Sequence, residues 1–172
     1  METSQLVPLR AMAHPVRVRV LSLLTGVTMS ATDIASELGI EHAVSSYHLR
    51  RLLDAGLIEV VEGGRTAKMG RTPVLYTVSE TVDDRLDRSV GTEAAFTAMV
   101  ADLGRRHRAI RRHRFESDAE VWLRPLVWDR LTALAKEMNA IVVANARRPR
   151  TRGTRSGSVT TLVFETGEGP AW

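Results

Sequence analysis

Apolar residues change from a helical to a strand spacing between residues 30 and 60. Three of them fall at i, i+1 and i+4 and therefore share one helical face: Ile34, Ala35 and Leu38. Ser30 precedes this segment and Asp33 follows three residues later, which is a variant of the capping box at a helix N-terminus. Gly39 follows the segment, and glycine is suited to a sharp turn at a helix end. The pattern predicts a short helix that ends in a tight turn.

A second helix is predicted from about residue 41 to residue 55. Its expected buried face has three leucines: Leu49, Leu52 and Leu53. Its opposite face carries polar side chains suited to base edges and phosphates: His42, Ser45, Ser46, Tyr47, Arg50 and Arg51. Gly56 ends this helix, and residues 57–61 then have the composition of a strand. Two helices joined by a short turn, the second with a polar face, describe a helix-turn-helix that reads the DNA major groove.

Sequence motifs on both sides of this pair resemble the ArsR-like winged-helix regulators. The similarity covers about the first 80 residues and rests on four segments: LRAMAHPVR at 9–17, IA at 34–35, SYHLRRL at 46–52 and AGLI at 55–58. Two positions depart from the family pattern. Glu41 replaces the usual Ser or Thr cap, and Ser45 replaces a usual apolar residue. The resemblance implies a winged helix-turn-helix that binds double-stranded DNA, with His48 as a packing residue.

A wing is predicted at residues 62–74, with glycines in its tip, between the strand at 57–61 and a return strand at 74–78. Arg65, Lys68 and Arg71 lie in this tip. Such cations fit a wing that touches phosphates or the minor groove, and a plain solvated loop is the alternative.

Residues 81–115 have the pattern of a long helix with glycine interruptions at Gly91 and Gly104. Its apolar stripe is longer than a small winged helix needs for its own core. The stripe consists of Val82, Leu86, Val90, Phe96, Met99, Leu103 and Ile110. We expect this stripe to serve self-association. The basic run at 105–114 is expected to be a solvated face or to meet an anion.

The remaining residues predict a strand–helix–strand unit over 118–166. Strands are expected at 119–123 and 158–165, and a helix at 125–146. The apolar face of that helix is formed by Val127, Leu131, Leu134, Met138 and Ile141. Four residues of the unit are candidates for an organic-effector pocket, or for an ordinary small core: Trp122, Trp128, Met138 and Phe164.

Composition narrows the class of protein. The chain is 44% hydrophobic and 26% charged, which is ordinary for a globular protein, and no run approaches the roughly 18 apolar residues of a membrane span. It has no cysteine, so disulfides and thiolate metal sites are excluded and the cytoplasm is the expected compartment. The net charge is +4, but residues 1–80 carry eight basic and eight acidic side chains. Any DNA affinity of that part must therefore come from the placement of its arginines.

Motifs of other classes are incomplete. The sequence has no phosphate loop and no nucleophile elbow, so no enzymatic activity and no cofactor is expected. His113 and Glu116 match half of the zinc site that some ArsR-like sensors carry, but the upstream half is missing and no metal site is predicted.

The sequence predicts an α+β protein that is mainly α. A winged helix-turn-helix at 1–80 is followed by a dimerisation and effector region at 81–172, made of the long helix and the small α/β unit. The predicted function is a homodimeric transcriptional repressor that reads a palindromic operator with half-sites about 34–36 Å apart. A small organic effector is a candidate further partner. The alternatives are a metal-responsive repressor of the same fold, and a small-molecule-binding protein or enzyme whose N-terminal half docks a partner.

Overall fold

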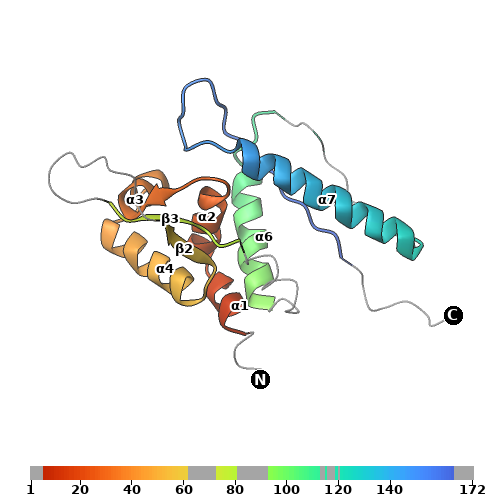
Figure 1. The fold of residues 1–172 in the computed structure, drawn as a ribbon, viewed down its shortest axis with the longest axis horizontal. Helices are drawn as coiled ribbons and strands as arrows, with labels where there is room; N and C mark the ends of the chain where they lie inside the picture. Colours follow the sequence, from red (N-terminus) through yellow and green to blue (C-terminus); the bar gives the residue numbers. More distant parts are fainter. Residues whose placement is uncertain are drawn as a thin grey trace.

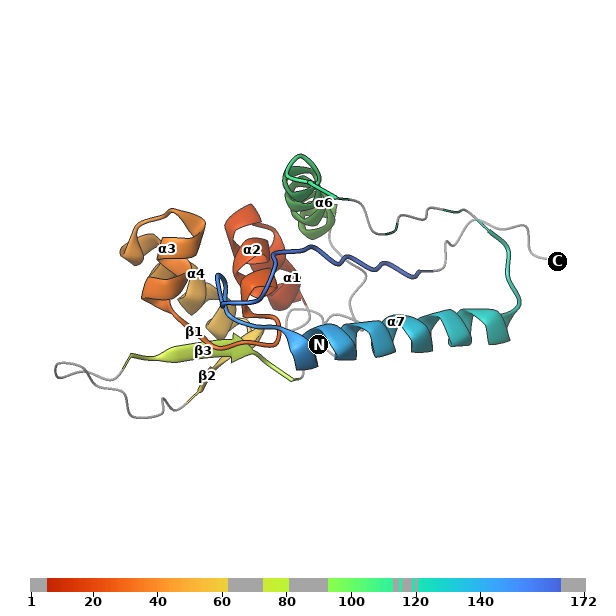
Figure 2. The same cartoon turned by 90° about the horizontal axis from the view of Figure 1, so that it is seen from above.

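The computed structural model describes residues 6–61, 73–80, 93–112, 115, 119 and 121–164. Its elements follow one another along the chain (Figure 1): α1 (Leu6–Met12), α2 (Pro15–Leu24), β1 (Met29–Ser30), α3 (Ala31–Leu38), α4 (His42–Asp54), β2 (Ile58–Val61), β3 (Leu75–Val78), α6 (Glu93–His107) and α7 (Pro125–Asn145). The N-terminal helices and the sheet form one packed body, from which most of α7 projects (Figures 1 and 2).

The helix ends follow the local chemistry that the sequence predicts. The hydroxyl of Ser30 accepts from the backbone N–H of Asp33, and the Asp33 carboxylate accepts from the N–H of Ser30, at 3.2 and 3.0 Å. This capping box satisfies donors that the first turn of α3 would otherwise leave free. Gly39 ends α3 in the left-handed region, with φ +66°. The predicted start and end of the first helix are confirmed.

The sheet is small and antiparallel, with strand order β1-β3-β2. Tyr76 of β3 lies between Met29 of β1 and Val60 of β2, and Ser30 and Val61 both pair with Leu75. The wing connection leaves the sheet at the Val61 and Leu75 end, so Thr28 and Thr77 lie at the end away from the tip. The hairpin stem was predicted, whereas β1 has only two residues and was not.

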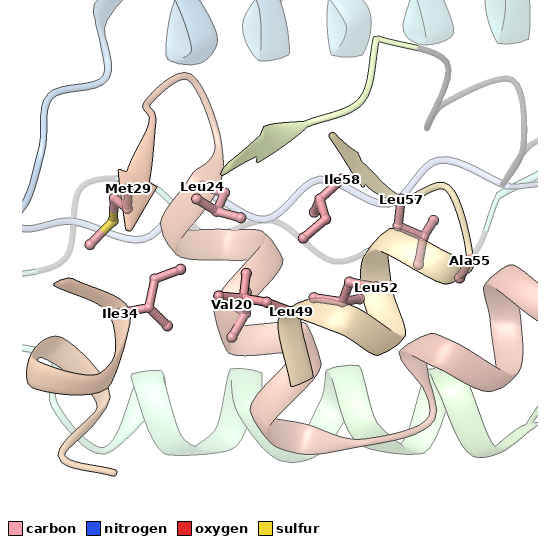
Figure 3. Close-up of a cluster of buried hydrophobic side chains, with 9 residues drawn as sticks. All are labelled: Val20, Leu24, Met29, Ile34, Leu49, Leu52, Ala55, Leu57 and Ile58. Atoms are coloured by element: carbon pink, nitrogen blue, oxygen red, sulfur yellow. The ribbon is translucent and has the colours of Figure 1, made fainter. Parts of the chain in front are cut away.

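A compact apolar cluster holds the N-terminal body together (Figure 3). Nine buried side chains make it up: Val20, Leu24, Met29, Ile34, Leu49, Leu52, Ala55, Leu57 and Ile58. Tyr76 is partly buried and packs against this cluster. Leu53 does not belong to it and is 37% exposed, so the prediction that it is buried was wrong. The cluster joins α2, α3, α4 and the sheet, and it thereby fixes the orientation of α4.

Helix α6 packs on α1 and α2 through its smallest side chains. Ala95, Ala98 and Asp102 are buried, while Phe96 and Leu103 of the predicted stripe are 53% and 37% exposed. The Asp102 carboxylate pairs with two arginines of its own helix, Arg105 at 2.7 Å and Arg106 at 3.0 Å. Part of the basic run therefore meets an anion inside α6.

The predicted helix 81–115 differs from α6 in two respects. Gly104 does not interrupt the helix, because it lies within α6, and the helix ends at His107 rather than near residue 115. The interruption predicted at Gly91, and all of 81–92, lie outside the described residues.

The prediction of two C-terminal strands was wrong for the described residues. Helix α7 forms as predicted, but residues 121–124 and 156–164 have no strand partner and are irregular. Alternating side chains make a strand only where another strand offers hydrogen bonds, and none does so in the described part of this region. The expected small α/β unit is thus reduced to one helix, with irregular segments before and after it in the chain. No helix of the described residues is long and apolar enough to cross a membrane.

Candidate nucleic-acid interface

The packing of α4 against α3 determines which of its side chains face solvent. The hydroxyl of Ser45 donates to the carbonyl of Ala31, at the start of α3, with 2.9 Å between the oxygens. Ser45 is completely buried, so its inclusion among the DNA-contacting residues was wrong. A buried hydroxyl that is already bonded to backbone cannot reach a base edge. Its role is to hold the two helices of the motif together.

The remaining predicted residues of α4 lie on or beside its exposed face. Tyr47 is 49% exposed, His42 and Arg50 are exposed, and Ser46 is half-buried. Tyr47 and Arg50 lie on the side of α4 that faces away from the apolar cluster, Ser46 lies beside that side, and His42 is exposed in the first turn. The structure brings these four predicted residues onto one surface.

Arg51 and Tyr47 form a local pair at the edge of this surface. The Arg51 guanidinium lies 5.6 Å from the centre of the Tyr47 ring, and its Nε donates to the phenol oxygen at 3.4 Å. This hydrogen bond lowers the pKa of Tyr47 and raises the pKa of Arg51. The contact orders two long side chains without neutralising the arginine, which stays available to an anion.

A shallow basic groove adjoins this pair where α1, α2 and α4 meet. It is lined by Arg10, Ala11, Arg17, Tyr47, Arg51 and Asp54. Arg17 also donates to the carbonyls of Arg10 and Ala11, which closes the C-terminal end of α1. Sequence reasoning did not assign Arg10 and Arg17 to the interface. Both lie in the 9–17 segment that carries the family resemblance. That resemblance could have indicated that they belong to the interface.

His48 has the packing role that the family resemblance implies, and His14 has a capping role. The Nδ1 atom of His14 accepts from the backbone N–H of Val16 at 3.2 Å, so His14 caps α2. His48 is 6% exposed, and its ring lies 4.6 Å from that of His14, between centroids. Burial, and then the charge of Arg17, lowers the pKa of His14; burial, then His14 and Arg17, lowers the pKa of His48. Both rings are therefore neutral near pH 7.

Other candidate residues lie outside the described chain or apart from one another. Arg65, Lys68 and Arg71 of the wing, and His113 and Glu116, are outside the described residues. Within the described part there is no group of three potential metal ligands.

The proposed effector residues do not form a pocket. Trp122 is 77% exposed, Met138 39% and Phe164 63%. Trp128 is half-buried, and no residue of α7 is fully buried. Within the described chain these four side chains line neither an enclosed pocket nor a closed core, because the strands expected to bring them together do not form.

A family model described as "Helix-turn-helix domain" matches residues 12–61, from the end of α1 to the end of β2. Together with the sheet, this shows that the N-terminal part of the chain is a winged helix-turn-helix, the DNA-binding module of transcriptional regulators. A DNA-binding regulator is the function that this module supports, and the closer likeness to ArsR-like regulators stays a resemblance of the sequence.

Solved structures were compared as well, and three similar chains illustrate the result. Reduced HlyU from Vibrio cholerae is 24% identical, over 63% of this chain and 90% of that one, with a TM-score of 0.37. The homodimeric DNA-binding domain of Mb0332 from Mycobacterium bovis is 19% identical, over 65% and 88%, with a TM-score of 0.38. Rv0081 from Mycobacterium tuberculosis is 23% identical, over 57% and 87%, with a TM-score of 0.38. Such low scores decide nothing about function. No curated protein matches the sequence.

Proposed function

We propose that this chain is a homodimeric transcriptional repressor that reads a palindromic operator in double-stranded DNA. One observation carries the proposal: the exposed face of α4 presents Ser46, Tyr47 and Arg50 from the second helix of a helix-turn-helix. Short hydroxyls and a planar guanidinium are suited to base edges in the major groove, where each base pair presents a distinct pattern of donors and acceptors.

Each group has a separate role in this proposal. Arg50 reads a guanine, and Tyr47 and Ser46 contact neighbouring bases or phosphates. His42 and Arg51 bind the sugar–phosphate backbone at the two edges of α4, with Arg10 in the adjoining groove. The wing residues Arg65, Lys68 and Arg71 add affinity that does not depend on sequence, through counterion release.

Dimerisation is supported by the outward side of α6. Phe96, Val100 and Leu103 are 53%, 47% and 37% exposed, while Ala95 and Ala98 on the other side pack on α1 and α2. An exposed apolar stripe on a helix that is already anchored is suited to a second copy. A twofold axis would place two α4 helices about 34–36 Å apart, in successive major grooves.

We place the boundary of the DNA-binding unit after α6 rather than at residue 80. Helix α6 shares a buried surface with α1 and α2, and the carboxylate of Asp102 lies within that packing. A fragment that ends at residue 80 would expose the surface of α1 and α2 that α6 covers.

A gel-shift titration with the DNA upstream of the chain's own gene tests the DNA-binding proposal. Arg50→Ala should weaken specific binding by about 1–3 kcal/mol, since it removes a bidentate contact to a base. Arg152→Ala is the charge-matched control, because Arg152 is an exposed arginine of the loop after α7. Neutralising the three wing cations should reduce the slope of log K against log salt by about 2–3 and keep the sequence preference. Unchanged binding by alanine variants of Arg50, Tyr47 and Ser46 would exclude α4 as the reading helix.

Repression is tested separately, with a reporter gene behind the same DNA. Wild-type protein should lower reporter output, and Arg50→Ala should restore it in proportion to its lost affinity. A reporter that rises when wild-type protein is added would identify an activator.

A further inference from the structure

Helix α7 carries an apolar seam that is exposed at four of its five residues and half-buried at Val127. The seam residues follow spacings of four, three, four and three: Val127, Leu131, Leu134, Met138 and Ile141. This is the a/d repeat of a coiled coil. Leu131, Leu134, Met138 and Ile141 are 37%, 44%, 39% and 59% exposed.

The C-terminal end of α7 is already in use. It lies at the turn between α2 and β1, where a Cβ on Gly26 would come within 2.4 Å of the Val143 carbonyl oxygen and 2.8 Å of the Ala146 Cβ. Ile141, the last residue of the seam, is still 59% exposed, so this contact leaves the seam free. A helix that pairs with the seam must therefore stop short of the last turn of α7.

We propose that α7 pairs antiparallel with α7 of a second copy of this chain, over residues 125–140. In this register Leu131 packs against the partner's Leu134, and Val127 packs against the partner's Met138. The paired region ends before Val143, as the contact at Gly26 requires.

The residues that flank the seam support this register. On one side, Arg130 faces the partner's Glu137, and the twofold axis generates the same ion pair again. On the other side, Trp128 and Ala135 are each half-buried within one chain, and the part of Trp128 that stays exposed would lie over the partner's Ala135, so a large side chain meets a small one. Both flanks are therefore complementary when the two helices run in opposite directions.

Other arrangements lose this complementarity. A parallel pair would set Arg130 beside the partner's Ala135 and Glu137 beside the partner's Val142, with no ion pair. An antiparallel pair that overlaps along all of α7 would bring the two Glu137 carboxylates together. It would also cover the turn that contacts Gly26. The charges and the occupied end of α7 thus select one register.

The proposed pairing also has a geometric consequence. From its midpoint, between Thr132 and Ala133, to Ala146 is about 20 Å along the helix at 1.5 Å per residue. The two Gly26 contacts would therefore lie about 40 Å apart along the paired helices. The pairing does not depend on DNA binding, and it adds a surface separate from the α6 stripe.

Charge reversal in the full-length protein, followed by sedimentation equilibrium, tests the pairing. Arg130→Glu and Glu137→Arg should each raise the dimer dissociation constant about tenfold, because each turns two attractive contacts into repulsive ones. The double reversal R130E/E137R should return it to within about twofold of wild type. Lys136→Glu is the control, since Lys136 lies on the opposite side of the helix from the seam and should change little.

Disulfide trapping tests the register directly, because the natural chain has no cysteine. A mixture of L131C and L134C proteins should form a cross-linked heterodimer faster than either protein forms a homodimer. Single reversals without effect, failure of the double reversal to restore the dimer, or equal cross-linking in all three samples would overturn the proposal. A dimer that persists in those cases, with operator binding intact, would leave the proposed function standing.

Discussion

At the scale of single residues, adjacent positions of α4 divide between holding the helix in the fold and facing the proposed DNA interface. Ser45 is completely buried and bonded to Ala31, whereas Ser46, one residue later, is half-buried on the side of the interface. A step of one residue turns a side chain by about 100° around a helix, and this turn separates the two roles.

Alanine at each of these two serines should therefore have opposite effects. Ser45→Ala removes a buried hydrogen bond and should lower the free energy of unfolding by about 1 kcal/mol, with DNA preference unchanged. Ser46→Ala should leave stability within about 0.5 kcal/mol and weaken operator binding. Urea titration and gel shift of both variants provide the measurement. Lost specificity in Ser45→Ala at full stability would contradict the assignment.

The histidine pair makes stability depend on pH in a defined direction. The pKa values of His14 and His48 are lowered below the ordinary 6.5, so the unfolded chain takes up protons first as the pH falls. The free energy of unfolding should therefore hold above about pH 7 and decline below pH 6.5. Protonation would also remove the acceptor through which His14 caps α2.

Urea midpoints between pH 7.5 and pH 5 measure this effect, with His48→Gln as the comparison. The variant cannot titrate at this position, so its stability should fall less steeply over the same range. A wild type that becomes more stable toward pH 5 would show that these rings are not the controlling groups.

At the scale of elements, local sequence signals were sufficient to predict the helix-turn-helix. They did not predict which side chains are buried between its two helices, or which segments pair as strands. The cap at Ser30 and the turn at Gly39 follow from residues within a few positions of each other, and both were predicted. The burial of Ser45 could also have been predicted, because it lies four residues before Leu49 on the same face, where the family has an apolar residue. A polar side chain in an apolar position was mistaken for a surface residue.

The two C-terminal strands show the limit of pattern reasoning. Residues 158–164 alternate as a strand would, but alternation does not supply a neighbouring strand edge. The two-residue strand β1 shows the converse, since pairing with β3 creates a strand that is too short to have a pattern. The candidate pocket depended on the missing strands, so Trp122 and Phe164 remain exposed.

Gly26 and Gly39 have the same backbone conformation, so alanine variants of the two can distinguish backbone strain from the loss of the contact between Gly26 and α7. Gly26 has φ +70° and Gly39 has φ +66°, but only at Gly26 would an added Cβ lie within 4 Å of atoms of α7. Alanine at either site should cost about 1–2 kcal/mol for the left-handed conformation. Only Gly26→Ala should also detach the C-terminal end of α7.

Hydrogen exchange along residues 139–146 measures this detachment. Faster exchange should be confined to Gly26→Ala, while Gly39→Ala exchanges like wild type in α7. Equal exchange in both variants would show that the contact at Gly26 does not hold the helix.

At the scale of the whole molecule, two α4 helices must be held at a fixed separation for a palindrome to be read. The α6 stripe and the α7 seam are both available for this task, and α7 contacts the DNA-binding body at Gly26. In the proposed dimer, binding at the second half-site is intramolecular. Its gain in affinity depends on the geometry of the dimer and requires no further contact with DNA.

The spacing of half-sites should therefore control affinity more strongly than the bases between them. Inserting five base pairs at the centre of the operator turns one half-site to the opposite side of the duplex, since a helical turn is about 10–10.5 base pairs. Affinity should fall to that of a single half-site, a loss on the order of 100-fold or more. Replacing five central base pairs without changing the length is the control and should cost far less. Gel shifts with equal affinity for all three DNAs would mean that one protomer reads the operator alone.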